Sequence, residues 1–421
     1  MTNNFYIDIP SEVALVLDKL KENNFEAYIV GGCVRDCLMG SEPKDWDITT
    51  SATPTMIKHC FFEYKVIETG IAHGTVTVVL NGMPIEVTTY RVDGSYSDSR
   101  HPDEVKFSSS IIEDLARRDF TINAIAYSPD EGLIDPFEGV NDIVEGVVRC
   151  VGDASLRFTE DALRIMRGLR FASQLSFIIA PDTSKEITLK KDLLKNISLE
   201  RIIKELEGII TGYNVKSVLE EHIEVVYEVF PEIEEVFRCS DILKETLATI
   251  VYLEPSFIER FTVLLLPLVY NNAYSLEAVE KILRKLKFDR DTINSVTQLI
   301  EYYIIEIVPN KRAIKSLLRL MGGERLEQLI DIKEAKSFFS SVDSDNRYEV
   351  SLEIMNEVIA KKECFTLADL AINGNDLIEI GIPAGTEIGE ILNDILSDVI
   401  DEKIENTKEI LLVEVKKRKG R

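Results

Sequence analysis

Residues 28–50, YIVGGCVRDCLMGSEPKDWDITT, contain the pattern around which the rest of the chain is organised. The apolar run Tyr28-Ile29-Val30 precedes Gly31-Gly32, and a helix-compatible segment follows, so the glycines are expected at a strand-to-helix turn. Glycine allows backbone N–H groups to approach an anion closely at the positive end of a helix. The stretch therefore predicts a phosphate-binding turn.

Two carboxylates follow the glycines on the same stretch. Asp45 and Asp47 lead into Ile48-Thr49-Thr50, and residues i and i+2 of a strand point to the same face. Two like charges so close together favour a cation between them, and hard divalent metals prefer oxygen ligands, so we expect Mg²⁺ here. Glu86 is a third candidate ligand, and a solvent-facing strand residue is an equal alternative for it.

Each of these signals has a plainer explanation when it stands alone. A Gly-Gly pair is usually only a turn, and an Asp-x-Asp is usually a strand end or a helix cap. In this order and spacing, however, they describe a triphosphate on a glycine turn beside two metal ions held by paired carboxylates.

Bulk properties exclude several classes of protein. With 421 residues, 45% of them hydrophobic, the chain is long enough for two to four domains. It has no apolar run of membrane-spanning length and no signal peptide, so we expect a cytoplasmic protein. The net charge of −25 argues against indiscriminate nucleic-acid binding but allows a local basic track. The six cysteines and four histidines lack zinc spacing, and no histidine precedes an aspartate.

The predicted secondary structure changes near residue 150. Before it, strands alternate with helices, and Asn81-Gly82 predicts a hairpin joining 74–80 to 84–90. From 153 onward we expect helices at 159–175, 198–211, 215–229, 243–253, 257–270, 276–286, 290–307, 311–321, 324–337, 350–361, 367–379 and 387–412. Basic groups within this part would form an RNA track if they lay along one side, and otherwise are solvated helix faces: Lys185, Lys190, Lys191 and Lys195; Arg284, Lys285, Lys287 and Arg290; Lys311, Arg312, Lys315 and Arg319; and the terminal KKRKGR.

Three further segments contain candidate functional residues. Residues 91–103 are predicted to form a mobile loop, with Arg91 and Arg100 placed to close over a nucleotide. In 113–126, the side chains of Arg118, Asp119 and Asn123 would meet on one side of a helix, although a salt-bridged surface helix has the same pattern.

The segment 158–171 places Asp161, Arg164 and Arg167 at intervals of three on one helix face. An ion-paired helix is the plainer interpretation. The functional one is that an aspartate accepts from an exocyclic amine while an arginine donates to a ring acceptor, a combination that cytosine and adenine match and uracil and guanine do not.

Several segments, in this order, resemble class II (bacterial-type) tRNA nucleotidyltransferases, the CCA-adding enzymes related to bacterial poly(A) polymerases. They are GGCVRD (31–36), DWD (45–47), RRDFTINAIA (117–126), EDALRIMRGLRF (160–171) and ISLERIIKEL (197–206), while 370–396 resembles the family's tail domain. The middle, 215–345, contains none of these motifs, and its RNA contacts are unassigned. The resemblance implies a polymerase β-like α+β nucleotidyltransferase head with a mixed sheet and helices (1–150), followed by an all-α neck with the base-recognition helix (151–215), body (216–345) and tRNA-binding tail (346–421).

The resemblance also implies roles for the residues. Asp45 and Asp47 would be catalytic metal ligands, and Glu200 and Arg201 would support the base-reading helix. The nucleotide would contact Gly31, Gly32, Arg35, Arg118, Asp119, Asn123, Asp161, Arg164 and Arg167.

The implied activity is template-independent transfer of CMP and AMP from CTP and ATP to the 3′-hydroxyl of tRNA, adding CCA and releasing pyrophosphate with Mg²⁺ as cofactor. The partners are then tRNA, CTP and ATP, with no membrane and no protein partner inferred. An enzyme that adds only A, a poly(A) polymerase and a non-catalytic tRNA-binding protein remain alternatives.

Overall fold

The computed structural model describes residues 6–93, 105–271, 273–339 and 346–419. These divide into two compact units, unit 1 (residues 1–238) and unit 2 (residues 239–421). The boundary falls inside the body predicted at 216–345, and the division into head, neck, body and tail stays a prediction. From residue 94 to 103 the predicted loop, including Arg100, lies outside the described residues.

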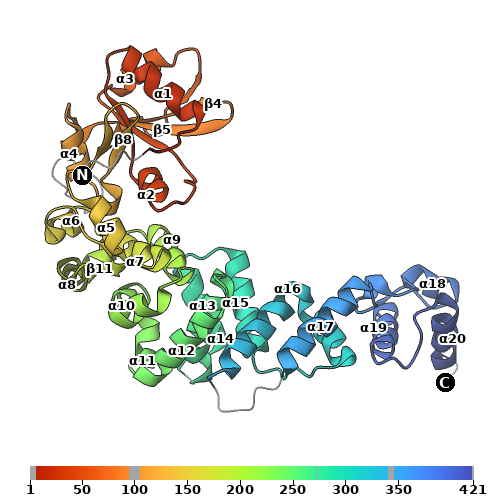
Figure 1. Cartoon of the computed structure of the whole chain (residues 1–421). Coiled ribbons are helices and arrows are strands. Elements are labelled where there is room, and N and C mark those ends of the chain that lie inside the picture. Colours follow the sequence, from red (N-terminus) through yellow and green to blue (C-terminus); the bar gives the residue numbers. More distant parts are fainter. Residues whose placement is uncertain (1–5, 94–104, 272, 340–345, 420–421) are drawn as a thin grey trace. The chain divides into compact units, whose positions relative to one another are not determined.

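Unit 1 begins with a mixed sheet (Figure 1), as the resemblance implied. In the described residues its strand order is β3-β4-β5-β2-β1-β8-β9; β2 and β5 are parallel, and the other described neighbours are antiparallel. The predicted hairpin is confirmed, because Asn81 and Gly82 both have the positive φ, 49° and 87°, that its tight turn requires. The strands are β1 (Ala27–Val30), β2 (Asp47–Thr50), β3 (Lys65–Ile67), β4 (Thr75–Leu80), β5 (Met83–Thr89), β8 (Ala126–Ser128) and β9 (Gly132–Ile134).

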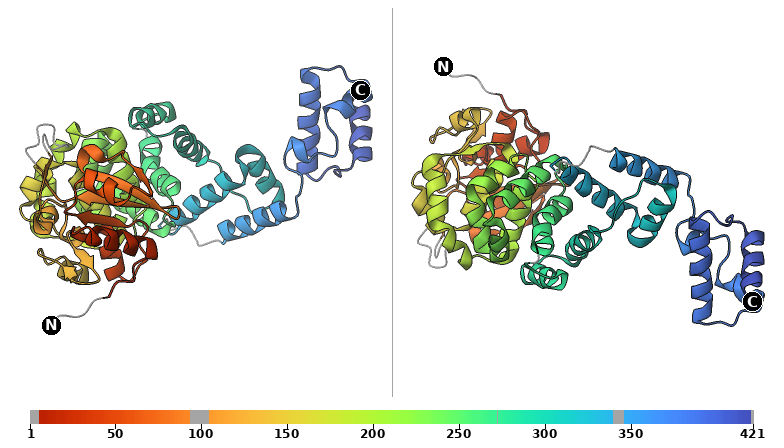
Figure 2. Two further views of the ribbon diagram at one scale, coloured as in Figure 1. Left: turned by 90° about the horizontal axis from the view of Figure 1, so that it is seen from above. Right: turned by 90° about the horizontal axis from the view of Figure 1, so that it is seen from below.

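Alternate residues of β1 belong to two different cores, Ile29 to one and Tyr28 and Val30 to the other, so both faces of this sheet are covered. Figure 2 gives two further views of the ribbon. Helices α1 (Ser11–Glu22) and α3 (Pro54–Cys60) contribute Leu17 and Ile57 to the main core on one face. On the other face α4 (Ile111–Ala116) contributes Leu115, which packs with Tyr90. The connecting elements are α2 (Gly32–Leu38), η1 (Ile71–His73), β6 (Arg91–Asp93), β7 (Val105–Phe107), η2 (Thr121–Asn123) and α5 (Gly139–Glu145).

The second half of unit 1 is helical apart from the short parallel pair β10 and β11. Helix α7 packs along α9, and Gly208 and Gly212 allow the close approach. The elements are β10 (Val147–Val148), α6 (Ala154–Glu160), α7 (Leu163–Leu175), β11 (Ile178–Ile179), α8 (Pro181–Lys190), η3 (Lys191–Asn196), α9 (Leu199–Ile210), α10 (Val215–Val229), η4 (Pro231–Ile233) and α11 (Glu234–Phe237).

Unit 2 consists of helices throughout its described part. Gly322, with φ at 78°, interrupts α16, which agrees with the break predicted between 321 and 324. No helix in the described ranges is both long enough and apolar enough to cross a bilayer. The elements are α12 (Ser240–Tyr252), α13 (Phe257–Tyr270), α14 (Leu276–Lys285), α15 (Arg290–Tyr302), α16 (Lys311–Ser337), α17 (Arg347–Ala360), η5 (Leu367–Asp369), α18 (Gly374–Glu379), α19 (Thr386–Ile400) and α20 (Lys408–Lys419).

Three predicted helices are wrong because local caps interrupt them. The helix at 159–175 is divided at Asp161, whose carboxylate accepts the N–H of Leu163 and so starts a new helix. The helix at 387–412 ends at Ile400, and Glu402 follows with φ at 58°. In 367–379, Asn373 caps a separate short helix.

The contact between α7 and α9 predicts a steric penalty at Gly212. A Cβ there would lie 2.1 Å from the Ser173 Oγ, so Gly212→Ala should lower the free energy of unfolding by about 1–3 kcal/mol in denaturant titrations. The control is Gly389→Ala within α19, where a Cβ meets nothing within 4 Å and alanine should add about 0.5–1 kcal/mol. Equal effects from the two substitutions would contradict this packing.

Candidate nucleotide-binding site

The predicted strand-to-helix turn at the glycines is confirmed, and its binding of phosphate stays a prediction. Strand β1 ends at Val30, α2 begins at Gly32, and Gly31 has φ at 81°, which favours glycine. A Cβ on Gly31 would lie 2.9 Å from Nη1 of Arg118, so glycine also gives room to that guanidinium. The turn thus has an arginine against its backbone, a suitable arrangement for an anion.

The candidate metal ligands lie beside this turn, on the middle strands of the sheet. Strand β2 begins only at Asp47, so the expectation that Asp45 belongs to the strand is wrong. Burial still alternates: Trp46 is in the core, Asp45 is exposed and Asp47 is half-buried. Asp47 is paired in register with Glu86 of parallel β5, and paired residues on neighbouring strands point to the same side.

The electrostatics of these carboxylates suit a cation. Burial, then the charge of Glu86 and, more weakly, that of Asp45 raise the pKa of Asp47 to about 6, against the opposing effect of Arg118. Among the described residues, no three His, Cys, Asp or Glu side chains are grouped closely enough to hold a metal ion by themselves. Asp47 and Glu86 are nevertheless neighbours of like charge, which suits a hard cation that also takes ligands from substrate.

Asp119 is the centre of a buried network. Its Oδ2 accepts from Nε of Arg167 at 2.7 Å, and its Oδ1 accepts from Nδ2 of Asn123 at 3.2 Å. Asn123 in turn accepts from Nη1 of Arg35 at 2.7 Å. Burial alone would raise the pKa of Asp119, but the charges of Arg167 and Arg164 and these hydrogen bonds hold it well below its usual range.

The prediction that Arg118, Asp119 and Asn123 meet on one side of a helix is wrong. Residues 117–120 are not helical, so Asp119 and Asn123 meet through a bend and η2, while Arg118 turns to Asp114 at 3.4 Å instead.

The sequence analysis did not identify Phe171 as a site residue. Its ring centre lies 5.3 Å from the guanidinium carbon of Arg35 and 5.2 Å from that of Arg167. The signal available was an aromatic residue after the repeated arginines of 164–170.

The side chains of the two predicted base readers are held by other residues, while the Arg164 N–H donates to the Asp161 carbonyl at 3.0 Å. Arg164 is buried; its Nη1 donates to Glu160 at 2.9 Å and its Nη2 donates to the carbonyl of Arg117 at 2.8 Å. Asp161 accepts from Nη2 of Arg201 at 3.4 Å, so the predicted supporting residue does contact it. Glu200 is exposed.

Among the described residues, three guanidinium nitrogens near these side chains are buried without an acceptor. In the part of the chain that the structure describes, Arg118 Nε, Arg157 Nε and Arg201 Nη1 are buried without a hydrogen-bond partner. A buried guanidinium donor without an acceptor is costly. Because protein encloses these nitrogens, a ligand oxygen would reach them only after neighbouring side chains move.

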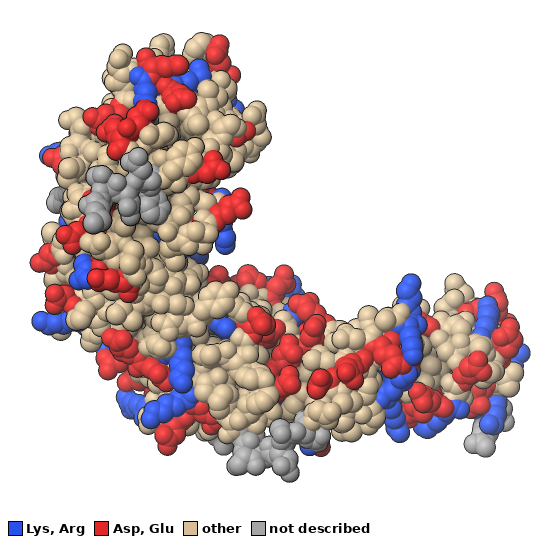
Figure 3. Space-filling model, in the orientation of Figure 1, with Lys and Arg blue, Asp and Glu red and all other residues tan. Residues whose placement is uncertain are grey.

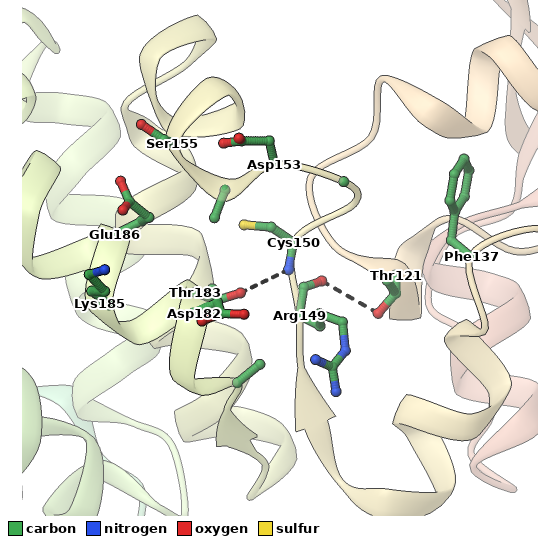
Figure 4. A pocket seen from close by; sticks show the side chains of 13 residues that line it. Thr121, Phe137, Arg149, Cys150, Asp153, Ser155, Asp182, Thr183, Lys185 and Glu186 are labelled. Carbon is green, nitrogen blue, oxygen red and sulfur yellow. Dashed lines mark hydrogen bonds between the residues drawn. The ribbon is translucent and has the colours of Figure 1, made fainter.

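A separate cavity of about 470 Å³ lies between Thr121, the Arg149–Cys150 segment and the start of α8 (Figure 4). Its wall includes Cys150, whose N–H donates to Thr183 at 3.1 Å, and the Arg149 carbonyl, which accepts from the Thr121 hydroxyl at 3.4 Å. None of the sequence-predicted site residues lines it. The cavity is therefore distinct from the candidate nucleotide site.

The basic groups predicted for an RNA track are largely ion-paired in unit 2. Figure 3 shows a band of Lys and Arg across the described part of this unit. Lys311 and Lys315 both bind Glu363, at 2.9 Å and 2.7 Å, and Arg312 pairs with Asp401. These side chains therefore tie α16 to the segments that follow α17 and α19, which reduces the charge available to RNA.

The ion pair of Asp119 predicts a pH-dependent stability defect. Arg167→Met would leave a buried carboxylate without its main partner, which should cost about 3–5 kcal/mol of unfolding free energy near pH 7. Arg167 lowers the pKa of Asp119, so its removal raises the folded-state pKa and the variant takes up a proton at a higher pH than wild type. The stability deficit relative to wild type should therefore shrink as pH falls toward 5. Denaturant titrations at both pH values, with wild type as reference, measure this; a deficit that grows on acidification would contradict the pair.

Comparisons with known proteins agree with this geometry. The model of the poly A polymerase head domain matches residues 27–149, and that of a putative tRNA nucleotidyltransferase domain 2 matches residues 259–415. The chain is 34% identical over 402 residues to the CCA-adding enzyme of Limosilactobacillus reuteri, covering 95% of this chain and 94% of that one. It is 36% identical over 409 residues to that of Staphylococcus haemolyticus, covering 95% and 96%.

A solved structure is similar over the whole chain. The Bacillus stearothermophilus CCA-adding enzyme in complex with CTP is 31% identical, with a TM-score of 0.78 over 98% of this chain and 100% of that one. The Thermotoga maritima CCA-adding enzyme complexed with tRNA, 23% identical, has the same fold with a TM-score of 0.64 over 97% and 96%. By sequence and by fold, the chain belongs to the family of CCA-adding enzymes.

Proposed function

We propose that this protein adds CCA to the 3′ end of tRNA by transferring CMP and AMP from CTP and ATP, with release of pyrophosphate. The observation that carries the proposal is the placement of Asp47 and Glu86 in register beside the Gly31 turn. Similarity over nearly the whole length of CCA-adding enzymes supports the same activity.

The chain's own residues bind and orient the triphosphate. The Gly31 turn and Arg118 offer backbone and guanidinium donors to the phosphates, and the ring of Phe171 supports Arg35 beside them. Asn123 is fixed between Arg35 and Asp119, which places its amide for the ribose. This arrangement aligns the α-phosphate for attack by the tRNA hydroxyl.

Asp45 and Asp47, with Glu86 as a third candidate, would hold the divalent metal that nucleotidyltransferases use, and we propose that it is Mg²⁺. When bound, the metal supplies charge neutralisation at the attacking hydroxyl and at the leaving pyrophosphate. The proposal extends to a cytoplasmic location and to a tail at 346–421 that binds tRNA.

Base choice would come from Asp161 and Arg164. Arg164 is buried and fixed by Glu160 and by the Arg117 carbonyl, so its remaining N–H groups have a defined direction. A fixed donor set next to a carboxylate accepts cytosine or adenine and opposes the ring N–H of uracil or guanine.

A product-length assay tests the function. Purified protein with Mg²⁺ is incubated with tRNAs ending before CCA, after C and after CC, with CTP and ATP separately and together. Addition that stops at CCA is expected. Addition of A alone to the CC-ended tRNA would indicate a partial enzyme, a long A tail would indicate a poly(A) polymerase, and absence of product would favour a tRNA-binding protein.

Substitutions at the three candidate carboxylates should show which of them bind the metal ion. Asp47→Asn and Asp45→Asn should reduce turnover by about 10³-fold or more, because charge on the transferred phosphate is then poorly neutralised. Mn²⁺ binding followed by electron paramagnetic resonance in the presence of CTP should weaken in both variants. Glu86→Gln distinguishes ligand from neighbour: weaker Mn²⁺ binding would make Glu86 a ligand, and unchanged binding would leave it a surface residue.

A further inference from the structure

Asp114 is a buried carboxylate that neither the sequence prediction nor the proposed mechanism uses. Its side chain has no exposure to solvent. Oδ1 accepts from the Arg91 N–H at 3.3 Å and from Nε and Nη2 of Arg117 at 3.0 Å and 2.8 Å. Oδ2 accepts from the Thr49 hydroxyl at 3.1 Å and from Nη2 of Arg118 at 3.4 Å. One carboxylate thus joins β2, the start of β6 and the end of α4.

The carboxylate is charged at neutral pH. Burial would raise the pKa of Asp114, but the charges of Arg117 and Arg118 and the hydrogen bonds hold it below its usual value. An ionised carboxylate accepts charge-assisted bonds that an amide of the same shape cannot replace for two arginines.

The first consequence concerns the phosphate side of the site. Arg118 lies against Gly31, and its charge also acts on Asp47. Asp114 is the ion-pair partner of Arg118 in the described residues. The carboxylate therefore fixes the guanidinium between the glycine turn and the candidate metal ligand.

The second consequence concerns the base side. The side chain of Arg117 is held by Asp114, and its backbone carbonyl accepts from Nη2 of Arg164 at 2.8 Å. Without the carboxylate, the Arg117 side chain would lose its ion-pair partner. The end of α4, which carries the Arg117 carbonyl, would then be held less firmly. Arg164 would then lose one of the contacts that set its direction.

We propose that Asp114 is a positioning residue that simultaneously aligns Arg118 for the triphosphate and Arg164 for the base, and so couples catalysis to nucleotide choice. The inference rests on the proposed function, because CTP and ATP are the ligands concerned. It assigns the coupling to a residue that contacts neither substrate nor metal.

The test compares Asp114→Asn with Asp114→Glu. Equilibrium binding of CTP and UTP is measured by titration calorimetry, and kcat and KM for CMP and UMP addition are measured on tRNA. Asp114→Asn should weaken CTP binding about tenfold and reduce the preference for CTP over UTP. Asp114→Glu retains the charge and should recover part of the affinity.

A stability-matched control separates positioning from general destabilisation. Val16→Ala removes buried atoms from α1, in the main core of unit 1 and outside the site network. It should lower the melting temperature yet leave the CTP-to-UTP preference at the wild-type value. The same unchanged preference in Asp114→Asn would overturn the proposal.

A double-mutant cycle tests the route through Arg118. In an Arg118→Ala background, the effect of Asp114→Asn on CTP affinity should become much smaller than in wild type, because residues in one network are not additive. Fully additive effects would overturn the coupling. CTP binding without CCA addition by the wild type would overturn only the proposed function, and absence of CTP binding would overturn both.

Discussion

The ion pair between Asp119 and Arg167 is the constraint on which the candidate site depends. An unpaired carboxylate at this depth would cost several kcal/mol, so α7 must present Arg167 to the segment that follows α4. The same carboxylate orients Asn123, which holds Arg35 near the glycine turn. The pair thus fixes phosphate-side and base-side elements relative to each other within unit 1.

Local signals made part of this site predictable from sequence. The turn at Gly31 and the hairpin at Asn81-Gly82 depend on backbone conformations that few residue types adopt, so short patterns specify them. The sequence predicted the two strands that carry Asp47 and Glu86. It did not predict the pairing of these two residues, because β-strand patterns do not give the parallel register between strands.

Features of the site that were not predicted from the sequence depend on contacts between distant residues or on single side-chain bonds. Asp119 and Arg167 are 48 residues apart, and spacing along one helix could not indicate their contact. The break at Asp161 was missed because the helical periodicity of the apolar residues continues across it, whereas Asp161 itself is extended and its carboxylate accepts the N–H of Leu163. Asp114 lies three and four residues before two arginines, so an ion pair was foreseeable, but not its burial under β2 and β6.

The protein contacts of the proposed base reader explain how it could select without a template. An arginine has five N–H groups, and the described contacts of Arg164 use three of them, on Glu160 and on the carbonyls of Arg157 and Arg117. The donors that remain are directed by those contacts, and Asp161 is similarly directed by Arg201. Because both groups are fixed before a base arrives, a base with the wrong pairing edge would leave the remaining Arg164 donors without an acceptor, and these donors cannot turn away. Discrimination then comes from the energetic cost of the wrong nucleotide as much as from attraction of the right one.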